Sequence, residues 1–212
     1  MPTILLTGFQ PFGGHKTNPS QQIAERLHGE TISGARVIGV TLPVAFAESA
    51  ELLTAAIAEH KPALIISLGL AAGSTCLEVE RFAVNLRVVE RGDPALPLPR
   101  NAPQTVIVAD GMTALFSTIN AERVAAAIGA KADIPALAHS YAGPYVCNSV
   151  FYQALHYALQ WDLQYCAGFI HLPLTSEQAR AENKMHLASL PLESLMAGVR
   201  AALEEAYNDT RN

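Results

Sequence analysis

Short apolar runs alternate along the chain with stretches that have the spacing of amphipathic helices. The run ALIISL at 63–68 is continuously apolar, as in a parallel strand that helices cover on both faces. The segment 46–60 instead places apolar residues at helical spacing among strong helix formers. Further strands are expected at 3–7, 36–42, 105–109, 135–141 and 164–171, and further helices at 18–28, 121–130, 148–160 and 192–207. This alternation predicts an α/β fold, a three-layer α/β/α sandwich with a mostly parallel, twisted central sheet.

The chain length predicts one domain. Its 212 residues, half of them hydrophobic, are enough for a large core, and they contain no internal repeat, low-complexity tract or linker. We therefore expect a single α/β domain over residues 1–212. The alternation lapses at 69–104, where loop and extended structure is expected, and 86–112 is the section with the weakest pattern.

Charge and composition exclude several classes of partner. The net charge is −5, and the 14 basic residues form no run or stripe, so a surface that follows a nucleic-acid backbone is not expected. The acidic balance gives no attraction to anionic lipid. The N-terminus has no signal-peptide pattern, and no stretch approaches the ~18 apolar residues of a membrane span. We expect neither a nucleic-acid partner nor a membrane partner.

The cysteine count indicates a reducing compartment. There are three cysteines, an odd number, and no Cys-x-x-Cys pair, so a disulfide framework or a structural zinc site is disfavoured. The expected location is the cytoplasm.

Cys147 is the most informative residue for chemistry. It falls at the start of an expected helix, where unpaired N–H groups and the positive end of the helix dipole favour a thiolate. A small buried core cysteine is the alternative, and position alone does not decide between them.

A histidine and a carboxylate can join this cysteine. Ligands in open α/β sheets bind beyond the carboxyl ends of the strands. The expected strands at 63–68, 135–141 and 164–171 lead to Gly69, to Cys147 and to His171. A thiol needs an adjacent base, and a carboxylate such as Glu80 would fix that base's orientation. The alternatives are a structural histidine at a strand end and a solvated Glu80–Arg81 pair at a strand start.

The loop after the first strand carries two aromatic residues, Phe9 and Phe12. It lacks Gly-Lys-Ser/Thr and the GxGxxG pattern, so a phosphate site is not indicated. Aromatic residues three apart suit the walls of a flat apolar pocket, although they could equally fold back onto the core. The loop ends at Asn18-Pro19, which suits a helix cap and first turn.

Taken together, four ordered segments resemble the pyroglutamyl peptidase I (pyrrolidone-carboxylate peptidase) family of cysteine peptidases. They are Leu6-Thr7-Gly8-Phe9-Gln10-Pro11-Phe12-Gly13-Gly14 with Asn18-Pro19-Ser20, Glu80-Arg81-Phe82-Ala83-Val84-Asn85, Ala142-Gly143-Pro144-Tyr145-Val146-Cys147-Asn148, and Gly168-Phe169-Ile170-His171-Leu172-Pro173. Their order and spacing agree with the family over nearly the whole chain.

The resemblance implies a catalytic triad and a reaction. Cys147 would be the nucleophile, His171 the base and acid, and Glu80 the third member. The reaction would remove an N-terminal pyroglutamyl residue from a peptide through a thioester, with no metal and no organic cofactor. The resemblance also implies a homotetramer.

The implied substrate pocket consists of Phe9 and Phe12 with Tyr145 and Val146, and backbone groups near Leu70 would bind the lactam. A pyroglutamyl group is neutral, whereas an ordinary N-terminus is an ammonium that would cost several kcal/mol to bury unpaired.

Two segments depart from the family pattern, and two other interpretations of the function stay open. The family usually has Gly-Gln-Ala-Gly-Gly-Arg where this chain has Gly69-Leu70-Ala71-Ala72-Gly73-Ser74, and residues 86–103 do not reproduce its Ala-Arg-Ile-Pro-Asp-Asn run. One alternative is a nucleoside phosphorylase or nucleosidase of similar architecture. The other is a non-catalytic pyroglutamate-binding relative with altered pocket loops.

Overall fold

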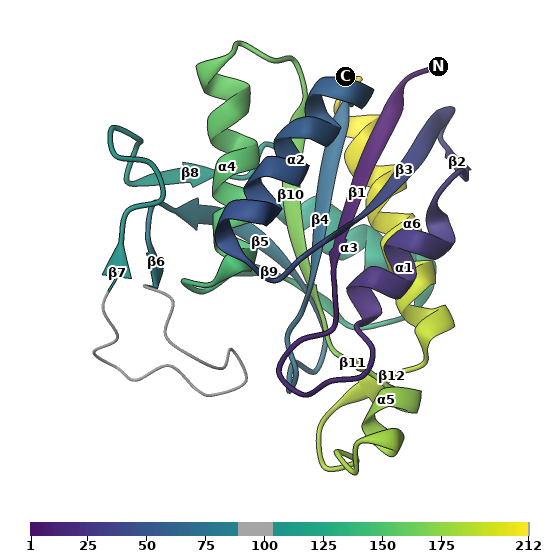
Figure 1. Cartoon of the computed structure of the whole chain (residues 1–212). Coiled ribbons are helices and arrows are strands. Elements are labelled where there is room, and N and C mark those ends of the chain that lie inside the picture. The colour runs from purple at the N-terminus through teal and green to yellow at the C-terminus, as the bar shows by residue number, and fades with distance from the viewer. Residues whose placement is uncertain (89–103, 212) are drawn as a thin grey trace.

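A single large sheet organises the molecule. The computed structural model describes residues 1–88 and 104–211. Eight strands form the sheet in the order β2-β3-β1-β4-β10-β5-β8, and β9 pairs with β5 (Figure 1). In that order, the strands are β2 (Thr31–Ile32), β3 (Ala35–Leu42), β1 (Thr3–Phe9), β4 (Leu64–Leu70), β10 (Cys166–Leu172), β5 (Leu77–Val84), β8 (Ala114–Phe116) and β9 (Ala136–Tyr141). Two short pairs lie outside it, β6 (Arg87–Val88) with β7 (Gln104–Thr105) and β11 (Leu174–Thr175) with β12 (Ser189–Leu190).

The centre of the sheet is parallel, and the strand direction reverses on one side. Strands β3, β1, β4 and β10 run parallel to one another. Strand β5 is antiparallel to β10, and β9 is parallel to β5. The predicted mostly parallel sheet is therefore confirmed, with β5 and β9 running opposite to its centre.

Helices cover both faces of this sheet, as Figure 1 shows. They are α1 (Pro19–Leu27), α2 (Phe46–His60), α3 (Ala121–Ala132), α4 (Val146–Gln160), the short α5 (Ser176–Ala181) and α6 (Leu192–Asp209). Alternate residues of β1 enter opposite cores, because side chains alternate along a strand. Ile4 and Leu6 pack in the core that contains residues of α1, α3 and α6, whereas Leu5 packs with residues of α2 and α4. The three-layer prediction is confirmed.

Expected and observed elements agree best where the pattern is regular. The helix expected at 46–60 has those bounds in the structure. Asn18 caps α1, because its side chain accepts a hydrogen bond from the backbone N–H of Ser20, and Pro19 lies in the first turn. Strands β1, β3, β4, β9 and β10 and helices α3, α4 and α6 lie within a few residues of their expected positions.

The section from 69 to 116 is where the expectations fail. Strand β5 lies in the region where loop and extended structure was expected without bounds, and Glu80 is in mid-strand and not at a strand start. The strand expected at 105–109 is wrong beyond Thr105. The N–H groups of Ile107 and Val108 are bound by the buried Asn85 side chain, each at 2.9 Å, and therefore do not join a strand ladder. Part of the expected loop, 89–103, lies outside the described residues.

Helix α1 packs closely on β3 because Gly39 has no side chain. A Cβ atom at position 39 would lie 1.9 Å from the carbonyl oxygen of Ala24, which is backbone and cannot move alone. At Gly129, in α3, the nearest atom to an added Cβ would be 3.9 Å away. Replacing glycine by alanine should therefore have opposite effects on stability at positions 39 and 129.

We expect Gly39→Ala to lower the free energy of unfolding by about 3 kcal/mol, because α1 must move off the sheet. Gly129→Ala should raise it by up to about 1 kcal/mol, because alanine favours the helix. Urea unfolding of both variants checks this. Equal effects of the two substitutions would contradict the packing described.

Candidate active site

The centre of the candidate site is a carboxylate with no exposed surface. Glu80 lies in the middle of β5 and is 0% exposed. Its Oε1 atom lies 2.7 Å from Nδ1 of His171, and its Oε2 atom lies 2.9 Å from Nδ1 of His139. An ionised carboxylate has only acceptors, so both imidazoles donate to it. The two histidines come from β10 and β9, the strands on either side of Glu80.

The sulfur of Cys147 completes the arrangement. Cys147 lies in the first turn of α4, and its interaction with His171 contributes to the raised pKa of that imidazole. A Cβ atom placed on Gly69 would lie 3.0 Å from the Cys147 sulfur and 3.0 Å from Cδ2 of His171. The three side chains that the sequence singled out thus lie together in the order Glu80, His171, Cys147. Gly69, which has no side chain, leaves room for the sulfur and the imidazole.

This environment stabilises the charged form of the His171 imidazole. Burial alone would lower its pKa, because a buried cation loses its hydration. The hydrogen bonds to Cys147 and Glu80 and the negative charge of these groups outweigh burial and raise the pKa of His171 to about 10. Near neutral pH the ring is therefore an imidazolium, held between a carboxylate and a sulfur.

The strands bring Gly69, His171 and Cys147 together in a different way from the one expected from the sequence. Gly69 and His171 lie side by side near the carboxyl ends of the parallel strands β4 and β10. Strand β9 runs in the opposite direction, so its carboxyl end does not meet theirs at one edge. Residues 142–145 carry the chain back to the site, with Gly143 in the left-handed conformation at φ +74°. The predicted convergence is confirmed, but the predicted reason is wrong for Cys147.

The side chain of Asn148 fixes the start of α4 to β5. It is 0% exposed, its Oδ1 atom accepts from the Val84 N–H at 2.9 Å, and its Nδ2 donates to the carbonyl oxygens of Val84 and Leu86 at 2.8 and 2.9 Å. Cys147 is the preceding residue, so these bonds hold the Cys147 backbone close to the strand that carries Glu80.

The first turn of α4 offers backbone N–H groups as hydrogen-bond donors. N–H groups in the first turn of an α-helix have no helical acceptor, and they lie at the positive end of the helix dipole. Cys147 belongs to that turn. The start of α4 can therefore stabilise negative charge that develops next to the sulfur.

Comparisons with known proteins agree over nearly the whole chain. The family model described as "Pyroglutamyl peptidase" matches residues 2–209. The pyrrolidone-carboxylate peptidase of Coprothermobacter proteolyticus is 38% identical over 204 residues, 96% of each chain. That of Erwinia tasmaniensis is 38% identical over 209 residues, 97% of this chain and 95% of the relative. The chain belongs to the pyroglutamyl peptidase family.

Solved structures of this family have the same fold. The pyrrolidone carboxyl peptidase of the hyperthermophile Pyrococcus furiosus is 34% identical and superposes with a TM-score of 0.89 over 98% of this chain and 99% of that one. The segment Gly69-Leu70-Ala71-Ala72-Gly73-Ser74 departs from the family pattern, yet its first two residues complete β4 of the central sheet.

The expected pocket residues of this family member fall into two groups. Phe12 and Leu70 pack in one small apolar cluster. Tyr145 and Val146 pack in the core that contains residues of α2 and α4, and this core also contains Phe9. Phe9 is the last residue of β1 and is 2% exposed, so for Phe9 the alternative of a core aromatic is the one observed. Phe9 and Phe12 do not share a cluster.

Two residues near the triad were missed by sequence reasoning, His139 and Glu78. Glu78 shares a strand face with Glu80, and one side-chain atom each of Glu78, Glu80 and His171 lie within 4.8 Å of one another. This trio has the residue types of a metal site. However, both Glu80 oxygens already bind histidines, and Glu78 accepts a hydrogen bond from Ser74 at 2.7 Å. Alternation along β5 and β9 would have been the signal for both residues.

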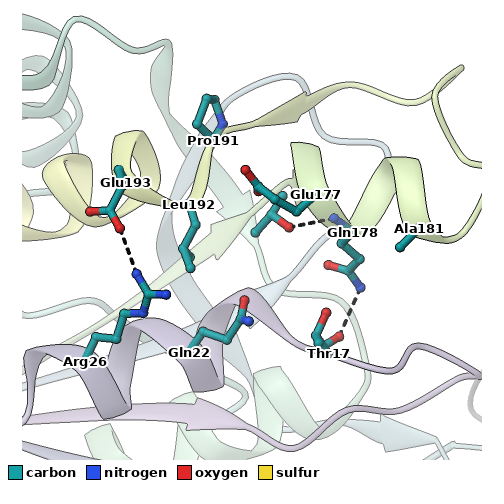
Figure 2. A pocket seen from close by; sticks show the side chains of 10 residues that line it. Thr17, Gln22, Arg26, Glu177, Gln178, Ala181, Pro191, Leu192 and Glu193 are labelled. Atoms are coloured by element: carbon teal, nitrogen blue, oxygen red, sulfur yellow. Dashed lines mark hydrogen bonds and ion pairs between the residues drawn. The ribbon is translucent and has the colours of Figure 1, made fainter.

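A separate cavity of about 380 Å³ lies between α1, α5 and the start of α6 (Figure 2). Arg26 reaches Glu193 across it at 2.7 Å, and Gln178 donates to the Thr17 carbonyl oxygen at 3.0 Å. The amide oxygen of Gln178 is buried without a hydrogen-bond partner among the described residues. None of the triad residues lines this cavity.

No described helix combines the length and the apolar composition that crossing a membrane needs.

We expect Gly69→Ala to lower kcat by at least about a hundredfold, because the new methyl group would displace the sulfur or the imidazole by a fraction of an ångström or more. Turnover of a pyroglutamyl amide measures this, and urea unfolding separates misplacement from loss of the fold. Native kcat in the Gly69→Ala variant would show that the sulfur and the imidazole do not occupy the space over Gly69.

Proposed function

We propose that this chain hydrolyses the amide bond after an N-terminal pyroglutamyl residue, with Cys147 as nucleophile, His171 as acid and base, and Glu80 as the group that orients His171. The family membership supports the reaction. The observation that carries the residue roles is the buried Glu80–His171 hydrogen bond of 2.7 Å, with the Cys147 sulfur and the same imidazole ring both next to Gly69.

The reaction proceeds in two steps. The Cys147 thiolate attacks the pyroglutamyl carbonyl carbon, and N–H groups at the start of α4 stabilise the oxyanion. The C–N bond then breaks as His171 gives its proton to the leaving amine, which leaves a thioester. In the second step His171 takes a proton from water, the hydroxide attacks the thioester, and the C–S bond breaks. Pyroglutamate leaves, and the imidazolium and thiolate are restored.

Glu80 makes this cycle possible without exchanging protons itself. Its hydrogen bond to Nδ1 leaves Nε2 of His171 for the sulfur and the leaving amine, so one tautomer and one ring orientation are selected. Its negative charge stabilises the imidazolium that is present before attack. An imidazolium beside a thiol in turn favours the thiolate, which is the nucleophilic form.

Substrate selection follows from charge. Phe12 and Leu70, with Tyr145 and Val146 next to the nucleophile, supply the apolar surroundings of the pyroglutamyl ring, and Phe9 packs in the core that Tyr145 and Val146 contact. Backbone groups at 69–72 pair with the lactam N–H and C=O. An N-terminal ammonium in these surroundings would be desolvated without a counter-ion, at a cost of several kcal/mol.

The assembly and location of the enzyme are part of the same proposal. The resemblance to the family favours a homotetramer of one-domain subunits in the cytoplasm. All three cysteines are free, which suits a reducing compartment. The reaction as written requires no cofactor.

Release of the chromophore from a pyroglutamyl amide tests the proposal. We expect turnover by the native protein, none above background by Cys147→Ala, and a loss of about a hundredfold or more in kcat for His171→Ala and Glu80→Gln. The matched prolyl amide, which carries a charged ring nitrogen and lacks the lactam carbonyl, should react at least about a hundredfold more slowly.

Three results would overturn it. Undiminished turnover by Cys147→Ala would remove the nucleophile from the mechanism. Calorimetric binding of pyroglutamate with no hydrolysis by the native protein would favour a binding protein, and activity on nucleosides that survives iodoacetamide would favour a nucleoside-processing enzyme.

A further inference from the structure

Glu80 has two carboxylate oxygens, and the proposed triad uses one. The other, Oε2, lies 2.9 Å from Nδ1 of His139. His139 is the direct register partner of Glu80 across the parallel β5–β9 pair, so the two side chains leave the same face of the sheet. The contact is therefore fixed by backbone pairing and does not depend on a flexible loop.

The hydrogen bond has a clear physical consequence for the carboxylate. A fully buried carboxylate loses its hydration, and each oxygen left without a donor costs free energy. With His171 on one oxygen and His139 on the other, the carboxylate plane is held at both ends. Without His139, Glu80 could rotate about its terminal bond, and its bond to His171 would lose its fixed direction.

We propose that His139 is a positioning residue of the catalytic site: its Nδ1–H holds Oε2 of Glu80, so that Oε1 stays directed at His171. This inference rests on the proposed function for its effect on turnover. It extends the triad to a chain of four side chains, in which His139 is the member furthest from the sulfur.

His139 also links the buried site to solvent. Its side chain is 44% exposed, whereas that of Glu80 is fully buried. The titratable groups on its face of the sheet are Glu78 and Glu80 on β5, Tyr141 on β9 and, beyond Glu80, His171 on β10, with Cys147 on α4 next to His171.

The opposite face of β9 packs against α3, whose charged side chains are engaged elsewhere. Arg123 pairs with Glu205 and Asp209, and Lys131 pairs with Glu204. Glu122 pairs with Arg81 of β5, and Asp133 caps the end of the helix. The group that shares a hydrogen bond with His139 is thus Glu80.

Three variants separate positioning from structural support. His139→Ala removes the donor. His139→Asn keeps an N–H donor close to the position of Nδ1 but does not titrate. Leu137→Ala is the matched control, because Leu137 is an exposed residue on the same face of the same strand, two positions away.

The first readout is the pH profile of kcat/KM on the pyroglutamyl amide. We expect His139→Ala to lower kcat/KM about tenfold. The alkaline limb of the pH profile reports loss of the His171 proton, and it should move to lower pH in this variant, because a loosely held Glu80 stabilises the imidazolium less. His139→Asn should restore most of the rate and the native limb, and Leu137→Ala should leave the limb in place.

The second readout does not require turnover. The rate at which iodoacetamide alkylates Cys147 at pH 7, located by peptide mass spectrometry, should fall severalfold in His139→Ala and recover in His139→Asn. If the native protein turns over substrate but the alanine variant keeps both its alkaline limb and its alkylation rate, the positioning role is wrong and the triad stands. If the native protein does not turn over substrate, the proposed function fails, and the alkylation rates still decide whether His139 acts on the site.

Discussion

A carboxylate without exposed surface must obtain charge compensation and hydrogen-bond donors from the protein around it. Glu80 obtains both from its neighbouring strands, as His171 on β10 and His139 on β9 donate to its two oxygens. Removing a donor from a buried charged pair costs more than the pair itself contributes. The position of the imidazole, its charge and the reactivity proposed for Cys147 all depend on this one arrangement.

The remainder of the fold keeps that arrangement in place. Gly69 leaves the space that the sulfur and the imidazole share, and Asn148 ties the start of α4 to β5 through three hydrogen bonds to backbone groups. The acid and its two histidines lie on paired strands, while the nucleophile lies on a helix anchored to one of those strands. Each component is therefore attached to a rigid element, as a preorganised site requires.

Much of this was accessible from the sequence, because regular elements have strong local signals. The apolar run at 63–68 and the helical spacing at 46–60 predicted β4 and α2, and residue type with position selected Glu80, Cys147 and His171. Strand β5 was expected only as extended structure without bounds, because its face toward the site carries Glu78 and Glu80 in place of the apolar residues typical of a buried strand. The reversed direction of β5 and β9 depends on tertiary packing, and no local sequence pattern encodes it. Alternation along β9 gives the face on which His139 lies, but its contact with Glu80 follows from the register of β9 with β5, so His139 was overlooked.

The protonation state of the His171 ring tests the central claim most directly. Histidine-ring NMR of the native protein should show His171 as an imidazolium through neutral pH and titrating near pH 10, and Glu80→Gln should lower that value. The sign follows from the cause, because the Glu80 charge and hydrogen bond raise the pKa of His171 and their removal takes that contribution away. A native His171 that titrates near the ordinary histidine value of about 6.5, unchanged in Glu80→Gln, would contradict the account.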